Sequence, residues 1–519
     1  MANKNLFKSL AGKLIPATNA INEERAPAYK LSPKHQLAQY AATGCLNTTF
    51  YATANEQLAK VIELCAEVDA EFIAKTAVFC RERGFMKDMP ALLTASLSVK
   101  DRGLLARVFP RVIDNAKMLR NFVQIMRSGV VGRKSLGTAP KRLVREWFDA
   151  RDPATLFKSN VGQAPSLADI VKMVHPKPKD VMREALFGYF IGRDYSFDVM
   201  PNIAREYELF KKDRSREVPD VPFQMLTALE LGTPEWTAIA RRAPWQMTRM
   251  NLNTFARHGV FGVEGMTKLI ADRLRDAKAI ATARVFPYQL RLAYAMANAN
   301  AAIPREVTDA LQDAMEIAIA NVPVIEGRVF VCPDVSGSMF SPVTGHRAGA
   351  TTSVSCIDVA ALIAAAVLRK NPYAEVLPFQ CHVVKANLNS RDSVMTNAAK
   401  LASIGGGGTS CSAPLAELNR REAKGDLVIF VSDNESWVDA RGGRGTATMR
   451  EWNRFKQRNP EARLVCIDVQ PYQTVQAIER EDILNVGGFS DQVFDVVSEF
   501  ARGELNADHW IGVIDSVKL

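Results

Sequence analysis

The stretch that most constrains the fold of this 519-residue chain is an apolar run at 328–332, which is followed by Asp334, Ser336 and Ser338. A β-branched apolar run of this length is typical of a buried strand in a parallel sheet. Ligands of such sheets collect at the carboxyl ends of the strands, where the Asp-x-Ser-x-Ser segment falls. One carboxylate and two hydroxyls are small, hard oxygen ligands that favour Mg²⁺ over a soft metal. The sequence therefore predicts an α/β domain with a cation site at one sheet edge.

Two later stretches could complete the same site. A glycine-rich loop at 405–408 precedes Thr409, and the apolar run 427–431 ends at Ser432 and Asp433. A purely structural alternative stays open, in which Asp334 caps the next helix and the serines satisfy its first turn. Strand, Asp-x-Ser-x-Ser, loop threonine and strand-end aspartate in this order resemble the metal-ion-dependent adhesion site of von Willebrand factor A domains. The resemblance implies Mg²⁺ or another divalent cation, held by Asp334, Ser336, Ser338, Thr409 and Asp433.

This predicted site lacks the groups that catalysis needs. An aspartyl phosphotransferase would have a second aspartate at the position of Ser336, and the glycine loop lacks the lysine of a P-loop. The remaining metal positions would be filled by water or by a carboxylate of a partner. We therefore expect a docking site, and no catalytic residues.

The periodicity of the apolar residues divides the chain into two halves. In the back half, helical patterns at 353–369, 414–422 and 446–458 alternate with strand patterns at 374–379, 427–431 and 463–469, which predicts a doubly wound parallel sheet. The boundary falls at 321–326. We expect a helical domain over 1–322 and an α/β domain of the von Willebrand factor A type over 323–519.

In the front half, apolar residues recur at three- and four-residue spacing, and proline or glycine marks most joints. A succession of short helices predicts stacked antiparallel pairs in the manner of HEAT-type solenoids, although no strict sequence period is present. The expected helices are 55–68, 69–83, 89–100, 104–113, 119–127, 141–148, 167–174, 179–190, 223–231, 235–241, 248–256, 263–274, 288–297 and 305–319.

Charge is unevenly distributed between the two halves. Residues 323–519 carry 20 Lys+Arg against 23 Asp+Glu, a net charge of −3, whereas residues 1–322 carry 46 against 33, a net charge of +13. A basic front half indicates a polyanionic partner, nucleic acid before membrane, because no basic amphipathic anchor stands out. The alternative is a solvated basic face with no partner.

Several front-half segments resemble the TROVE domain of the Ro autoantigen family. They are 40–51, 74–81, 174–178 and the stretch 222–245 with its continuation at 250–252. In the back half, segments 334–339, 407–409 and 432–435 also have the spacing of that family. The resemblance spans roughly residues 30–510. It implies a ring of helical repeats closed by the A domain, which binds small noncoding Y RNAs on its outer rim and single-stranded ends of misfolded RNAs in a basic channel, in RNA quality control.

The candidate RNA-binding residues are mostly basic. The run from Arg120 to Arg145 contains no Asp or Glu, and such side chains on a helical surface can neutralise several phosphates with little base preference. Lys158 and His175 match Y RNA-contacting positions of the family, whereas Gly162 stands where the vertebrate pattern has a basic residue. For His175 an exposed helix-ending histidine is the structural alternative. The predicted set is Arg120, Arg127, Arg133, Lys134, Lys141, Arg142, Arg145, Lys158, His175 and Lys177.

Two functions remain open from the sequence: a non-catalytic RNA-binding protein of the Ro type, and a metal-dependent docking protein that uses the A domain and a helical solenoid. The eight cysteines show no CxxC pairing, and the N-terminus lacks the apolar block of a secretory signal. No stretch approaches the apolar length that crosses a bilayer. We expect a cytoplasmic monomer without membrane attachment, with RNA as partner and an exoribonuclease tethered through the RNA as a candidate.

Overall fold

The chain packs as two compact units in a computed structural model. The structure describes residues 15–43, 46, 48–162, 164–283, 285, 287–319, 322, 324–343, 354–439, 444–470, 472–488, 491–505 and 509–519. The first unit contains the described parts of Met1–Val68, Phe286–Leu292 and Ala318–Ser516; the second contains those of Asp69–Val285, Ala293–Ile317 and Val517–Leu519. The domain boundary that the sequence suggests, after residue 322, stays a prediction. Packing follows a different division, because the N-terminal segment joins the α/β unit.

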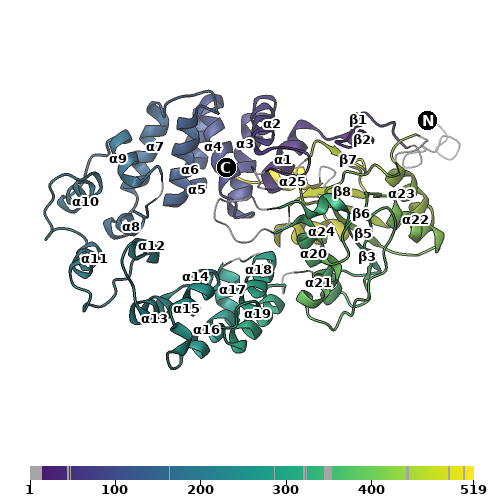
Figure 1. Ribbon diagram of the computed structural model, residues 1–519. Coiled ribbons are helices and arrows are strands. Elements are labelled where there is room, and N and C mark those ends of the chain that lie inside the picture. Colours follow the sequence, from purple (N-terminus) through teal and green to yellow (C-terminus); the bar gives the residue numbers. More distant parts are fainter. Residues whose placement is uncertain are drawn as a thin grey trace. The chain divides into compact units, whose positions relative to one another are not determined.

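The first unit contains the strands and the helices that cover them (Figure 1). Its elements are β1 Ala20–Ile21, β2 Pro27–Lys30, α1 Pro33–Thr43, α2 Ala54–Glu67, β3 Val329–Pro333, the 3₁₀ turn Gly337–Phe340, α20 Cys356–Lys370, β4 Glu375–Val376, α21 Val394–Ala402, α22 Ala413–Arg420, β5 Leu427–Ser432, α23 Ala447–Arg458, β6 Arg463–Asp468, β7 Thr474–Val475, β8 Ile483–Gly487, α24 Asp491–Ala501 and α25 His509–Asp515.

A five-stranded parallel sheet of order β4-β3-β5-β6-β8 is the centre of this unit. Alternate residues of each strand point to opposite faces, and β3, β5, β6 and β8 are buried on both. On one face, Phe330, Phe430 and Leu464 pack against Trp452 and Phe455 of α23. On the other, α20 contacts β3, β4 and β5, and α24 contacts β6 and β8. This is the predicted doubly wound A domain, and its strand and helix order is confirmed.

The N-terminal segment adds a second, small sheet to the same unit. Strands β1 and β2 form an antiparallel hairpin, and β2 also pairs with β7, in which Tyr29 lies opposite Val475. Helix α1 contacts β8 and α25. The front-half sequence gave no indication of these two short strands, since β1 has two residues and β2 has four.

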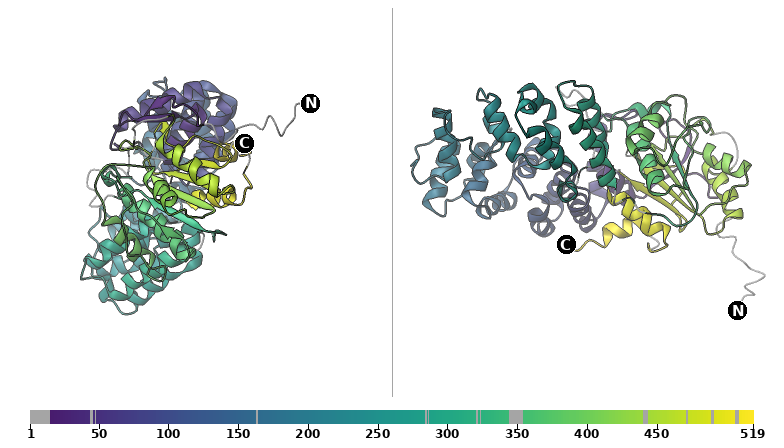
Figure 2. Two further views of the ribbon diagram at one scale, coloured as in Figure 1. Left: turned by 90° about the vertical axis from the view of Figure 1, so that its right-hand side faces the viewer. Right: turned by 90° about the horizontal axis from the view of Figure 1, so that it is seen from below.

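The second unit consists of helices (Figure 2). Contacts run between helices close in sequence, for example α3 with α4 and α5, α6 and α7 with α9, and α14 with α16 and α17, as expected for a HEAT-like stack. The helices are α3 Ala70–Glu82, α4 Asp88–Lys100, α5 Arg102–Val112, α6 Ala116–Ser128, α7 Thr138–Asp149, α8 Pro153–Lys158, α9 Leu167–Val174, α10 Val181–Ile191, α11 Asn202–Lys212, α12 Phe223–Leu226, α13 Thr233–Arg242, α14 Trp245–Met250, α15 Leu252–Arg257, α16 Met266–Arg275, α17 Ala277–Ala283 and α19 Arg305–Ala318. Helix α18, Pro287–Asn298, belongs to the first unit up to Leu292 and to the second from Ala293.

Two predicted helices differ from the structure. The helix expected over 248–256 is interrupted at Asn251, whose side-chain amide donates to the carbonyl oxygen of Met247 at 2.8 Å and so ends α14. The helix expected over 223–231 is the four-residue α12, which ends at Leu226. No helix in the described part of the chain has both the length and the apolar character to cross a membrane.

Candidate functional site

The predicted metal residues converge at the carboxyl edge of the A-domain sheet. Strands β3 and β5 are parallel neighbours, and the Asp334 backbone N–H donates to the carbonyl oxygen of Val431 at 2.9 Å. The hydroxyl of Ser432 donates to Oδ2 of Asp334 at 2.6 Å. Because Asp433 follows Ser432 directly, strand register alone brings the two predicted aspartates to the same edge.

The glycine-rich loop carries Thr409 to this edge. Gly406 and Gly407 have positive φ angles of 124° and 82°, which a side chain would strain, and the Gly337 N–H donates to the Gly407 carbonyl at 3.0 Å. The carbonyl of Thr409 accepts hydrogen bonds from the backbone N–H groups of Trp437 and Val438, both at 3.1 Å. The glycine loop is therefore hydrogen-bonded to the loop after β3 and to the loop after β5.

Within the site, oxygen atoms face one another at short distances. The Ser336 N–H donates to Oδ1 of Asp334 at 2.8 Å, and the hydroxyl oxygens of Ser336 and Ser338 lie 3.3 Å apart. Oδ1 of Asp433 accepts a hydrogen bond from the Glu435 backbone N–H at 3.3 Å. The exposed fractions of Asp334, Ser336, Ser338, Thr409 and Asp433 are 0%, 0%, 6%, 2% and 0%.

The electrostatics of the site suit a cation. Burial, and then the charge of Asp433, raise the pKa of Asp334; burial also raises the pKa of Asp433, so two buried carboxylates oppose each other's ionisation. Oδ2 of Asp433 is buried and has no hydrogen-bond partner among the described residues. No three His, Cys, Asp or Glu side chains of the described residues are grouped as a metal site, so hydroxyl ligands are needed. Hard oxygens from serine, threonine and aspartate fit Mg²⁺.

Further carboxylates that the sequence did not single out surround the predicted ligands. Burial and the charge of Asp433 raise the pKa of Glu435 and of Asp468 well above their usual values. Oε1 of Glu435 is buried without a described partner, and Oδ2 of Asp468 accepts a 2.9 Å hydrogen bond from Gln39 of α1. The sequence could have indicated both carboxylates, since Glu435 is two residues beyond Asp433 and Asp468 ends the strand next to β5.

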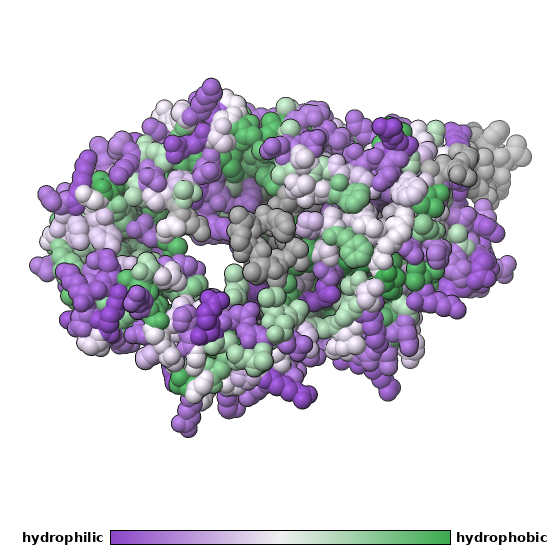
Figure 3. All heavy atoms as spheres, viewed as in Figure 1, coloured by the Kyte–Doolittle hydropathy of each residue, from purple (hydrophilic) through white to green (hydrophobic). Residues whose placement is uncertain are grey.

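Part of the predicted RNA-binding set forms an exposed basic surface around α9. Helix α9 contacts both α6 and α7. Arg127 of α6 and Lys172 of α9 both lie near Asp169, whose pKa is lowered first by hydrogen bonds from Ser166 and further by these two charges. Hydrophilic residues cover much of α9–α11 on the face shown in Figure 3. We define the α9 surface as Arg127, Lys134, Arg142, Lys172, His175 and Lys177, all exposed. Lys172 was not among the predicted residues. Its position in the last turn of the predicted helix could have indicated it.

Three of the predicted arginines are committed to hydrogen bonds within the helical unit. Arg120 is only 6% exposed and donates to the carbonyl oxygens of Ser159 and Val161. Arg133 donates to the Ser98 carbonyl at 3.0 Å, and Arg145 donates to the Val174 carbonyl. The geometry assigns Arg120 to packing, because its guanidinium is hydrogen-bonded to the loop before α9. Lys141 is half-buried on α7.

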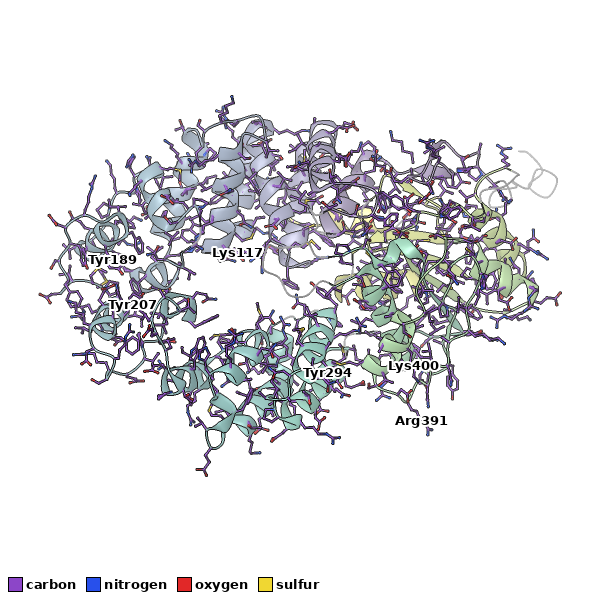
Figure 4. The ribbon with its side chains drawn as sticks, viewed as in Figure 1. Lys117, Tyr189, Tyr207, Tyr294, Arg391 and Lys400 are labelled. Atoms are coloured by element: carbon purple, nitrogen blue, oxygen red, sulfur yellow. The ribbon has the colours of Figure 1, made fainter. Side chains whose placement is uncertain are left out.

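Lys158 ends α8 and forms a 2.7 Å ion pair with Asp220. Tyr189 of α10 and Tyr207 of α11 hold α8 in place, with their rings 5.8 and 5.7 Å from that of Phe157 (Figure 4). The lysine lines a groove of about 630 Å³ together with apolar residues that include Phe223, Met247 and Met250. Lys158 is thus partly exposed, with its charge already paired.

His175 ends α9 in the left-handed conformation, with φ of 49°, and its side chain is exposed. Its backbone N–H donates to the Val171 carbonyl at 2.9 Å. Arg145 contacts the preceding carbonyl, so His175 lies beside the end of that arginine. The exposed, helix-ending histidine that the sequence suggested is confirmed, and its role in RNA contact stays a prediction.

Comparisons with known proteins agree with this architecture. Residues 328–501 match the family described as the Ro60 vWA domain. The chain is 24% identical to the RNA-binding protein RO60 of Deinococcus radiodurans, covering 97% of this chain and 100% of that one. It is 21% identical to the RNA-binding protein RO60 of Caenorhabditis elegans, covering 59% of this chain and 48% of that one.

A solved structure shows the same fold. The crystal structure of the Deinococcus radiodurans RO (RSR) protein matches with a TM-score of 0.60 and 20% identity, covering 91% of this chain and 100% of that one. The expected fold class of a helical region joined to an A domain is confirmed, and so is the resemblance that the sequence suggested: the chain is a relative of the Ro proteins, with a Ro60 vWA domain at residues 328–501.

Proposed function

We propose that this protein is an RNA-binding protein of the Ro type with no catalytic centre of its own. The observation that carries the proposal is the likeness, over 97% of the chain, to a protein named for RNA binding. The α9 surface supports it, because its exposed cations can neutralise phosphates without contacting bases. In this proposal the helical half binds RNA, and the A domain holds a divalent cation.

The finer proposal distinguishes two kinds of RNA. A Y-like small noncoding RNA binds near Lys158 and His175, and single-stranded ends of misfolded RNAs bind the basic helical surface, in RNA quality control. A folded RNA is recognised by its shape and by local hydrogen bonds, to which an exposed histidine can contribute. A single strand depends mostly on phosphate charge and base stacking.

In the A domain, the five predicted ligands would hold Mg²⁺, which would supply positive charge between Asp334 and Asp433. Each of these residues comes from one of three loops, so ion binding would also stabilise their mutual arrangement. The alternative of metal-dependent docking to other proteins has less support. The two relatives compared above are both named RNA-binding proteins, and neither name indicates protein docking.

Filter binding across a salt series tests RNA binding. Changing Arg127, Arg142 and Lys172 to Glu should weaken binding of a single-stranded oligonucleotide of any sequence. The salt slope should fall by about 0.7 for each phosphate contact that is lost. The matched control changes three exposed cations elsewhere in the helical unit, Arg257, Lys268 and Arg305, to Glu. Equal losses in both triple variants would show that total charge alone governs binding and would contradict the α9 surface.

A second measurement separates the two kinds of RNA. His175→Ser should impair binding of a Y-like stem-loop RNA and leave a plain single-stranded oligonucleotide nearly unaffected. Because the side chain is exposed, the melting temperature should stay unchanged. If both RNAs bind more weakly by the same factor, His175 does not distinguish them and this part of the proposal fails.

A further inference from the structure

A groove of about 630 Å³ lies within the helical unit, beside the end of α8. The loop before α12, together with residues of α12, α13 and α14, lines it along with Lys158 of α8. Its volume is in the usual range of small-molecule sites, about 300–1,000 Å³. We call it the Lys158 groove, and its walls include Lys158, Asp220, Phe223, Arg242, Met247 and Met250.

Hydrogen bonds hold one wall of the Lys158 groove in place. Arg242 of α13 donates to the Val218 carbonyl at 2.6 Å, at the start of the loop before α12. The hydroxyl of Tyr207 on α11 donates to the Met225 carbonyl of α12 at 2.9 Å. The segment 218–225 is therefore fixed at both ends, so the groove is formed before any ligand binds.

The apolar lining of the groove suits a flat aromatic ligand. Met247 and Met250 both line it, and Met250 is 68% exposed although its side chain is apolar. Thioethers make favourable contacts with aromatic rings. Phe223 adds a ring on which a base can stack. Gln224, exposed at the same groove, carries an amide that can donate to and accept from the edge of a base.

The charged residues of the groove favour an anion beside that aromatic group. Among the described residues that line it, the charged ones are two cations, Lys158 and Arg242, and one carboxylate, Asp220. Nζ of Lys158 lies 2.7 Å from Oδ2 of Asp220, and the two side chains are 38% and 69% exposed. A phosphate oxygen can take the place of this carboxylate without displacing a buried group. An apolar surface beside a lysine that already holds an oxyanion fits a nucleotide better than an apolar peptide.

We propose that the Lys158 groove holds one unpaired base of a folded RNA, and that a phosphate of the same RNA replaces Asp220 on Lys158. Sequence-specific contacts to RNA are mostly made to unpaired bases of loops and bulges, which can be splayed out and stacked on protein side chains. A folded RNA with an unpaired loop offers both the base and the phosphate. The inference rests on the proposed Ro-type RNA binding and deepens it, and it makes Asp220 a competitor of the RNA.

Filter binding of the full-length protein to two Y-like stem-loop RNAs tests the groove. One RNA has an intact loop, and the other has an abasic loop with the same phosphates. The parent should bind the intact loop at least about fivefold more tightly, the lower end for one stacked base. Met250→Ala and Phe223→Ala should each reduce that advantage, whereas Met250→Leu should keep it. Val99→Ala, at an exposed apolar residue of α4, is the matched control and should bind as the parent does.

The same assay tests the competition by Asp220. Asp220→Asn should strengthen binding of both stem-loops by roughly two- to fivefold, because an exposed carboxylate no longer competes for Lys158. Asp313→Asn is the matched control, since it removes the partner of Arg275 from another exposed ion pair of 2.7 Å. A gain as large in Asp313→Asn would show that net charge alone strengthens binding and would contradict the role of Asp220.

The remaining outcomes separate the groove from RNA binding as such. If the parent binds the intact and abasic loops equally, no base enters the groove; the inference is overturned and Ro-type RNA binding stands. It is also overturned if Met250→Ala and Phe223→Ala weaken a plain single-stranded oligonucleotide as much as the intact stem-loop, or if they affect neither RNA, as expected for a peptide groove. A parent that binds no RNA refutes the proposed function itself. Melting temperatures identify any variant that fails to fold.

Discussion

Nε2 of His35 lies 3.0 Å from the carbonyl oxygen of Asn485, and this contact joins helix α1 to strand β8. The imidazole is buried, with its ring edge-on to that of Trp510 at 5.9 Å between centroids. On the other side of Asn485, Oε2 of Glu479 accepts from its backbone N–H at 2.9 Å and from its side-chain amide at 2.7 Å. One asparagine thus connects a buried histidine and a partly buried glutamate whose pKa values are shifted in opposite directions.

His35 should make the protein less stable in acid. Burial lowers the pKa of His35 to about 4, below the value near 6.5 in the unfolded chain. Between these values the unfolded state binds more protons, so the free energy of unfolding decreases as pH falls, by about 3 kcal/mol at most across the window. Urea unfolding of the parent and His35→Gln from pH 4.5 to 7.5 measures this. The variant should lose that part of the pH dependence, and parallel curves would contradict the assignment.

Glu479 should have the opposite effect to His35 and make the protein less stable as the pH rises. Burial raises the pKa of Glu479 to about 8, above the ordinary 4.5, so the folded state keeps a proton that the unfolded state has released. The free energy of unfolding then decreases as pH rises through this window, by at most about 1.4 kcal/mol per pH unit. Glu479→Gln imitates the protonated carboxyl and should flatten the decline between pH 5 and 8 in the same urea experiment. Glu461→Gln, at an exposed carboxylate, should change nothing.

Asp334→Ala should abolish the stabilisation by Mg²⁺ and spare RNA binding, because the predicted ligands and the α9 surface belong to different units. In the parent, Mg²⁺ at 100 times its dissociation constant should add about 2.7 kcal/mol to the free energy of unfolding. Thermal melts with Mg²⁺ and with a chelator measure this, and Asp392→Ala, at a surface ion pair with Lys400, is the control. Loss of RNA affinity in a folded Asp334 variant would contradict the division.

Substitutions of Arg120 and Arg142 should distinguish an arginine that stabilises the fold from one that binds RNA. Arg120→Ala leaves the carbonyls of Ser159 and Val161 without their donor and should cost about 1–3 kcal/mol of stability. Arg142→Ala, at an exposed position, should change stability by less than about 0.5 kcal/mol. It should instead reduce the salt slope of single-strand binding by about 0.7. Urea unfolding and filter binding of both variants decide this, and the reversed pattern would show that the assignment is wrong.

Gly162→Arg should strengthen binding of a Y-like stem-loop RNA. A Cβ atom at Gly162 would meet nothing within 4 Å, so the larger side chain has room. One new phosphate contact should steepen the salt slope by about 0.7 to 0.9. Gly262→Arg is the matched control, since a Cβ there also meets nothing within 4 Å. Equal gains in both variants would mean that added charge alone is responsible.

The sequence by itself determined the elements whose contacts are regular or nearly local. The apolar run before Asp334 predicted β3, and the order of strands and helices in the back half predicted the sheet, because alternation and run length follow from burial on two faces. Periodicity predicted α9 over 167–174 with the bounds that it has in the structure. The convergence of Asp334 and Asp433 followed from parallel register alone.

Only the tertiary structure decided which polar groups are buried and what they contact. Arg120 and Arg142 belong to one basic run, but only the guanidinium of Arg120 donates hydrogen bonds to the carbonyls of a loop about 40 residues further along the chain. The contact of Glu23 with Glu435 spans 412 residues, and no local pattern marks it. Periodicity reports which face of an element is apolar, whereas the partner of that face, and the burial of charges beside it, depend on segments that meet only after the chain has folded.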